Sequence, residues 1–145
     1  MDELLYKLQF PKLSGIKEKK TSEPDKRYNC IAWAFKDNQR WWWPTPKAYW
    51  PVSRLANWSP LESFEDWFAR DGWTETPNRE PEPGFEKVAL YAKGGVPTHA
   101  ARMLDSGLWS SKLGMAIDLV HELGELEGPE YGTLLRVYRR KQKAT

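Results

Sequence analysis

The spacing of apolar residues along the chain distinguishes segments expected to be helices from segments expected to be strands. Residues 30–36 are an apolar run with helical spacing, and the polar Asp37 ends it. A second helix is predicted to begin at Ser59, because Ser59 and Glu62 have the spacing of a capping box. One face of this helix is apolar and carries Leu61, Phe64, Trp67 and Phe68. Gly72 follows its last turn and predicts the helix end.

Shorter apolar segments with turn residues between them predict strands. Residues 86–92, 97–104 and 108–112 read as a meander of three antiparallel strands joined by glycine-containing turns. Residues 115–126 have apolar residues at helical spacing and are expected to form a helix. Residues 132–138 supply a final strand. The order of these elements predicts an α+β fold, in which the helices are segregated from an antiparallel sheet.

The remaining segments are expected to be irregular. Residues 1–27 look like a leader, with an amphipathic start at Leu4, Leu5 and Leu8, followed by a charged loop. Residues 39–58 hold five tryptophans and several prolines, which are incompatible with a helix or a central strand. We therefore expect one domain over 1–145, with a core at 28–140 and a basic tail at 141–145.

Composition excludes several classes of protein. With 145 residues and one cysteine, the chain can bury a core but cannot form an internal disulfide. The net charge of +2 does not indicate nucleic-acid binding, and the basic run at 139–141 reads as a soluble tail. The first residues contain early acids and no long apolar run. This predicts a cytoplasmic protein with neither a signal peptide nor a membrane span.

The single cysteine, Cys30, lies at the expected start of the first helix. Free backbone N–H groups and the helix dipole favour a thiolate there, and Asn29 is a suitable N-cap. His99 lies far downstream on an expected strand, and a cysteine with a distant histidine is typical of a nucleophile and its base. The alternatives are a buried structural thiol and a structural histidine.

A helix-borne cysteine, a strand with the sequence Val-Ala-Leu-Tyr-Ala, a glycine turn and a strand with Thr-His-Ala resemble the NlpC-like branch of the papain-like cysteine hydrolases. The motifs at 29–34 (NCIAWA), 41–44 (WWWP), 98–102 (THAAR) and 109–114 (WSSKLG) also look like an uncharacterised bacterial family. The resemblance implies a small antiparallel sheet packed on the Cys30 helix. It also implies a base and an orienting residue on neighbouring strands.

The chain departs from that pattern at the base. Lys87 stands where the resemblance implies the histidine, and His99 matches the orienting position. Three outcomes remain open: His99 acts as the base from the adjacent strand, Lys87 acts as a base with a pKa lowered by burial, or the site is inactive. Ser110 and Ser111 alternate on the third strand, so only one of them can face His99 and bond to its ring. Our choice for the site is Ser111.

Other residues complete the candidate site. His121 and Asp118 have the spacing of a surface pair on a helix, and no residues have metal-motif spacing, so neither a metal nor a cofactor is expected. The aromatic residues expected to bind substrate are Trp41, Trp42, Trp43 and Trp109. Because alternate side chains of an extended segment face opposite ways, Trp42 should differ in burial from its two neighbours.

Two functions from different classes follow. The first is a cysteine hydrolase or acyl transferase acting on an amide or thioester of a peptide-like or acylated substrate. The second is an inactive domain of the same fold that binds a protein partner through its tryptophan-rich surface, for example in a bacterial toxin, immunity or phage-conflict system.

Overall fold

The computed structural model describes residues 8–15, 19–55, 57–113 and 117–142. The elements in these ranges are β1 (Lys20–Ser22), α3 (Cys30–Ala34), α4 (Pro60–Arg70), β2 (Thr74–Thr76), β3 (Phe85–Lys93), β4 (Val96–Met103), β5 (Trp109–Lys112), β6 (Asp118–His121), the 3-10 helix η1 (Leu123–Leu126) and β7 (Thr133–Lys141). The expected α+β class is confirmed.

All the strands belong to one antiparallel sheet of seven strands in the order β1-β6-β5-β4-β3-β7-β2. The expected meander is confirmed as β3, β4 and β5, and the expected final strand is β7. β7 pairs along the length of β3, which places the C-terminal strand inside the sheet rather than at its edge.

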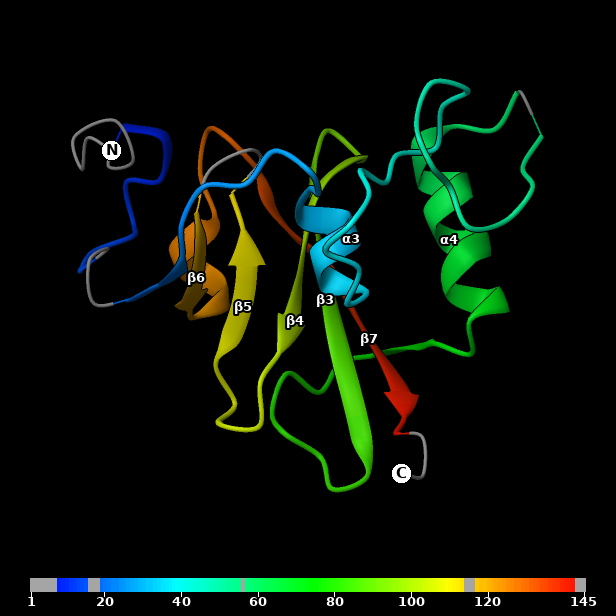
Figure 1. Cartoon of the computed structure of the whole chain (residues 1–145). Helices are drawn as coiled ribbons and strands as arrows, with labels where there is room; N and C mark the ends of the chain where they lie inside the picture. Colours follow the sequence, from blue (N-terminus) through cyan, green and yellow to red (C-terminus); the bar gives the residue numbers. More distant parts are fainter. Residues whose placement is uncertain (1–7, 16–18, 56, 114–116, 143–145) are drawn as a thin grey trace.

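The sheet separates two hydrophobic clusters, because alternate side chains of each strand point to opposite faces. The helix face is covered by α3, α4 and the tryptophan-rich segment, and Ile31, Phe64, Leu90 and Ala100 lie in its core. The opposite face is covered by the segment around Phe10 and by η1, and its core holds Tyr91, Ala101, Trp109 and Leu119. Figure 1 shows α3 lying across the middle strands, with α4 beyond it toward the β7 side.

The expected capping box forms at the start of α4. The Ser59 hydroxyl accepts the backbone N–H of Glu62, and the Glu62 carboxylate accepts the backbone N–H of Ser59. The apolar face of α4 packs on β7, where the ring of Phe68 stacks on Tyr138 with centroids 3.8 Å apart. The helix thus anchors the tryptophan-rich segment beside the sheet.

The prediction of a helix over 115–126 is wrong. Residues 114–116 lie outside the described ranges, residues 118–121 form β6, and only the short η1 follows. β6 pairs with β5, the strand before it in the sequence, and with β1, which is distant in the sequence. The pairing with β1 also shows that the expected N-terminal loop contributes a strand. Similarly, β2 lies in the segment expected to be a loop after Gly72.

The basic run near the C-terminus is not a soluble tail. Its arginines lie on β7 and form ion pairs with acids from other elements: Arg136 with Glu65, Arg139 with Glu82 and Arg140 with Asp71. These contacts attach β7 to α4 and to the loop before β3. Of the expected leader, Leu4 and Leu5 lie outside the described residues, and Leu8 is exposed.

Candidate functional site

Cys30 is the first residue of α3, as expected. The Asn29 side chain caps the helix by accepting the backbone N–H of Ala32 at 3.1 Å. The same oxygen accepts the N–H of Trp42 at 3.0 Å, and the Asn29 amide donates to the Trp42 carbonyl at 2.6 Å. Asn29 therefore fixes the start of α3 against the tryptophan-rich segment. The thiol itself is buried, with 6% of Cys30 exposed.

The expected lowering of the Cys30 pKa is wrong. Burial raises the pKa of the thiol to about 11, and this outweighs the backbone N–H groups of Ala100 and Ile31 and the charge of Lys112, which act in the opposite direction. The physical reason is that α3 has five residues and a buried start, so the dipole of a short helix competes with full desolvation. At neutral pH the thiol is protonated.

His99 lies on β4 and is fully buried. It is paired with Tyr91 of β3 in the sheet register, so both side chains lie on the face opposite α3. Its ring stacks on Tyr131 with centroids 4.0 Å apart and meets Tyr91 edge-on. The aromatic rings exclude water from the imidazole and limit its orientation.

A chain of hydrogen bonds continues from His99 across the next two strands. The Nε2 atom of His99 lies 2.9 Å from the Ser111 hydroxyl of β5, and this hydroxyl lies 2.6 Å from Nε2 of His121 on β6. The Nδ1 atom of His121 lies 2.8 Å from the carbonyl oxygen of Glu122. The expectation that one of the two serines faces His99 is confirmed: Ser111 does, whereas Ser110 accepts the indole N–H of Trp33 on the other face.

This series of hydrogen bonds determines which ring nitrogen of each histidine carries the proton. A carbonyl oxygen only accepts, so Nδ1 of His121 carries its proton and Nε2 accepts the Ser111 hydroxyl. The Ser111 oxygen then accepts from Nε2 of His99, which leaves a lone pair on Nδ1 of His99. Burial lowers the pKa of His99 well below 6.5 and that of His121 to about 4, so both rings are neutral. Within the described residues, Nδ1 of His99 has no hydrogen-bond partner.

The described contacts include no hydrogen bond between Cys30 and His99. The backbone N–H of Ala100, the residue after His99, lies beside the Cys30 sulfur, whereas the His99 ring lies on the opposite face. β4 and β5 are paired only at Arg102 with Ser110 and at Met103 with Trp109. The two strands are therefore unpaired between His99 and Ser111. α3 packs against both of these strands.

Lys87 is buried on β3, but its ammonium group is fully engaged. It donates to the carbonyl oxygens of Asn78 and Glu80 at 2.8 and 2.6 Å and forms an ion pair with Glu82 at 2.8 Å. An ammonium that donates three bonds has no lone pair for a base. Lys87 fixes the loop before β3, and the structure does not bring it together with Cys30.

The tryptophans expected to bind substrate differ in burial. Trp41 is 38% exposed and Trp42 is 5% exposed, which confirms that Trp42 differs from its neighbour, while Trp43 is half-buried. The Trp42 ring stacks on Phe35 with centroids 5.5 Å apart, so it belongs to the core. Trp109 is also a core residue, 3% exposed on the face opposite α3. The expectation of a substrate-binding surface is therefore wrong for Trp42 and Trp109.

Sequence reasoning missed two parts of the site. His121 was expected on a helix beside Asp118, but the two residues lie on opposite faces of β6, where Asp118 accepts a hydrogen bond from Tyr28 at 2.9 Å. The sequence Asp118-Leu119-Val120-His121 does not alternate between polar and apolar residues, so no local signal indicated a strand. The second part is Arg102, whose guanidinium lies 4.2 Å from the centroid of the Trp33 ring.

A family model for a domain of unknown function, DUF7689, matches residues 19–139, and the chain belongs to this family. No curated protein and no solved structure matches the chain significantly. In the described part of the chain, no group of three or more histidine, cysteine or acidic residues could hold a metal ion. No helix there is long and apolar enough to cross a membrane.

Proposed function

We propose that the protein is a cysteine hydrolase or acyl transferase that acts on an amide or thioester. The nucleophile is Cys30 and the base is His99. The observation that carries this proposal is the unpartnered lone pair on Nδ1 of His99, a ring that the hydrogen bonds through Ser111 and His121 hold in one orientation. An imidazole with one nitrogen oriented by hydrogen bonds and the other free is the arrangement that a general base requires.

The proposed reaction has two steps. As the Cys30 sulfur attacks the carbonyl carbon, the carbonyl electron pair moves to oxygen and the thiol proton passes to Nδ1 of His99. Because the His99 ring lies on the face opposite α3, the proposal requires this proton to pass between β4 and β5, where the two strands are unpaired. When the intermediate collapses, the bond to the leaving nitrogen or sulfur breaks, and His99 returns the proton to that atom. Water, deprotonated by His99, then cleaves the thioester at Cys30, and the thiol is regenerated. In an acyl transferase, a second nucleophile takes the place of water.

The Cys30 thiol and the His99 imidazole are both neutral at rest, and this determines when the proton is transferred. With a pKa of about 11, the Cys30 thiol is protonated at neutral pH, and the lowered pKa of His99 keeps its imidazole neutral. The site therefore contains no resting ion pair. The thiol proton must therefore be transferred while the carbon–sulfur bond forms. His99 acts as a base in each turnover and does not keep Cys30 as a thiolate beforehand.

The test is alkylation of the native protein. Cys30 is the single cysteine, so iodoacetamide reports on it alone. We expect the native protein to react at pH 7.5 and His99→Gln to react about a hundredfold more slowly, the size of a general-base contribution. Ser110→Ala is the matched control for Ser111→Ala, because Ser110 lies on the other face; only the Ser111 variant should slow the reaction.

The alternative function is a protein-binding domain in which Cys30 is a structural thiol. Two observations favour it: the thiol is 6% exposed, and the described contacts include no hydrogen bond between Cys30 and His99. In that case Cys30 reacts only after unfolding in urea, and His99→Gln leaves the rate unchanged. This result would refute the hydrolase proposal.

A further inference from the structure

Four side chains on the helix face of the sheet form a stack beside Cys30. Trp33, one turn along α3 from Cys30, stacks on Tyr28 with centroids 5.7 Å apart and planes at 26°. The Arg102 guanidinium lies 4.2 Å from the Trp33 centroid, and the Lys112 ammonium lies 5.0 Å from the Tyr28 centroid. Two cations therefore flank two aromatic rings, and the positive charge is concentrated near the thiol.

Arg102 differs from the other arginines of the central strands. Arg136, Arg139 and Arg140 of β7 each form an ion pair with a carboxylate. Within the described residues, Arg102 forms no ion pair. Burial lowers the pKa of its guanidinium, and the charge of Asp118, which accepts a hydrogen bond from Tyr28, opposes this shift from a distance. A half-buried guanidinium without a carboxylate has donor groups available for a ligand.

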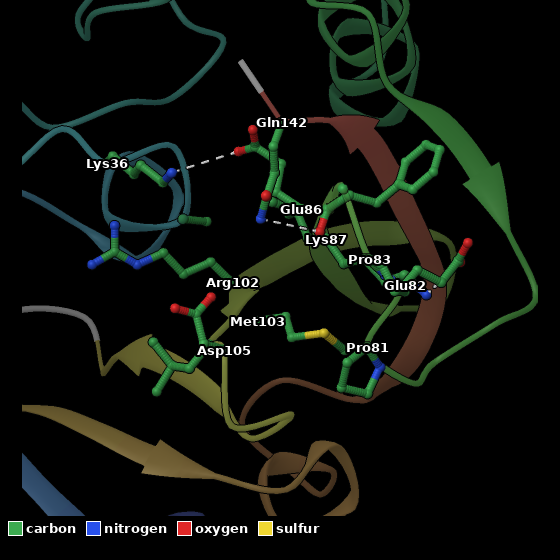
Figure 2. A pocket seen from close by; sticks show the side chains of 15 residues that line it. Lys36, Pro81, Glu82, Pro83, Glu86, Lys87, Arg102, Met103, Asp105 and Gln142 are labelled. Atoms are coloured by element: carbon green, nitrogen blue, oxygen red, sulfur yellow. Dashed lines mark hydrogen bonds and ion pairs between the residues drawn. The ribbon is translucent and has the colours of Figure 1, made fainter. Parts of the chain in front are cut away.

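Arg102 also lines a cavity with a volume of about 500 Å³. Figure 2 shows the stem of Arg102 along this cavity and its guanidinium on the side of α3. The other cations in the lining are Lys36, which pairs with Glu86 at 3.7 Å, and Lys87, which pairs with Glu82. Asp105 also lines the cavity but forms no ion pair with Arg102.

We propose that Arg102 binds a carboxylate of the substrate, so that the acyl compound attacked by Cys30 is acidic. This inference rests on the proposed function. The Trp33 ring contacts the face of the guanidinium and leaves the in-plane N–H groups free for a bidentate carboxylate. Arg102 is two residues along β4 from Ala100, which lies beside the Cys30 sulfur, a spacing of about 7 Å. The carboxylate is thus separated from the scissile carbonyl by a few bonds.

The experiment compares two alkylating reagents that differ in charge. Iodoacetate carries a carboxylate and iodoacetamide does not, and both report on Cys30. We expect the ratio of the iodoacetate rate to the iodoacetamide rate to be higher in the native protein than in the unfolded chain. Arg102→Gln should lower this ratio about tenfold, since a hydrogen bond to a charged group is lost. Any change that the variant causes in the reactivity of the thiol itself affects both rates and cancels in the ratio.

Arg70→Gln is the control for net charge, because Arg70 lies on α4 and pairs with Asp66 at the surface. It should leave the ratio as in the wild type. If both reagents react with native Cys30 and Arg102→Gln does not change the ratio, the role of Arg102 is refuted while the nucleophile stands. If both arginine variants lower the ratio equally, the effect is general electrostatics and the role of Arg102 is also refuted.

A second measurement does not depend on the thiol. Glutarate, a dicarboxylate, is titrated into the wild type and Arg102→Gln, and the indole N–H signal of Trp33, assigned with Trp33→Phe, is followed by NMR. We expect the signal to shift in the wild type and to stay in place in Arg102→Gln. Absence of a shift in the wild type overturns the carboxylate site. Inert Cys30 together with a glutarate shift refutes the proposed chemistry and retains the carboxylate site.

Discussion

The two buried histidines should make the stability of the protein depend strongly on pH. These are the only histidines in the chain, and both are held neutral between β4, β5 and β6. Burial lowers the pKa of His121 from 6.5 to about 4 and lowers the pKa of His99 well below 6.5. Because the folded pKa is below the unfolded pKa, the unfolded chain binds more protons as the pH falls.

The magnitude follows from the two pKa values. Above pH 6.5 the contribution of each neutral histidine to stability is complete, and it is lost as the pH falls from 6.5 toward the folded pKa. Between pH 7 and 5, an unfolded histidine gains its proton while His121 stays mostly neutral, which costs about 2 kcal/mol. The lowered pKa of His99 acts in the same direction. A loss of about 2 kcal/mol from His121 alone is already a sizeable part of the stability of a domain of this size.

The measurement is urea unfolding followed by tryptophan fluorescence at pH 7 and pH 5. His121→Gln removes one titrating group, so the loss of unfolding free energy between the two pH values should be smaller by about 2 kcal/mol than in the wild type. Carboxylates also titrate in this range, but they are common to both proteins and cancel in the comparison. Equal pH dependence in the wild type, His99→Gln and His121→Gln would show that the histidines are not buried and neutral.

Two further predictions test the packing around the sheet. Trp42→Ala should lower the unfolding free energy by about 3–5 kcal/mol because Trp42 is 5% exposed, whereas Trp41→Ala, at a position 38% exposed, should cost far less; comparable losses in urea unfolding would contradict the assigned burial. Gly132→Ala should prevent native β7 pairing, because its Cβ would lie 2.1 Å from the carbonyl oxygen of Ala92 at a φ of +77°. Gly84→Ala, with a φ of +83° and no atom within 4 Å, should cost only about 1 kcal/mol by thermal unfolding, and equal losses would contradict the close approach.

Elements whose signals are local could be predicted from the sequence. The capping box at Ser59 and Glu62 defines α4, and the turns after β3 and β4 define the meander. Alternation on β5 likewise predicted that one serine faces His99. Each of these signals lies within about ten residues, so no knowledge of the tertiary structure is needed.

β6 could not be predicted because its apolar residues have helical spacing and one of its two partner strands is distant. Ile117, Val120 and Leu123 are three residues apart, which imitates a helix, and the partner β1 is about a hundred residues away in the sequence. The prediction that the pKa of Cys30 is lowered was wrong for a related reason. Its position at a helix start was visible in the sequence, but the depth of burial depends on how α3 packs on β4 and β5. In both cases the tertiary environment outweighs the local pattern.

Alternation also could not determine which face of β4 the Cys30 helix covers. His99 and Ala101 share one face, and Ala100 and Arg102 share the other. A sequence containing both a histidine and an arginine at alternating positions fits either orientation of the strand. The structure places Arg102 on the helix face, over the Trp33 ring, and no local pattern singled out this residue.

The unpartnered Nδ1 atom of His99 separates the two candidate functions most sharply. A buried acceptor without a hydrogen bond costs about 1–3 kcal/mol, and the chain through Ser111 and His121 fixes the ring in the orientation that incurs this cost. If His99 is only structural, His99→Gln changes the unfolding free energy and leaves the alkylation of Cys30 unaltered. If Nδ1 takes the thiol proton, the same variant slows alkylation even at temperatures where it is fully folded. Measuring the unfolding free energy and the alkylation rate of His99→Gln therefore distinguishes a structural histidine from a catalytic base.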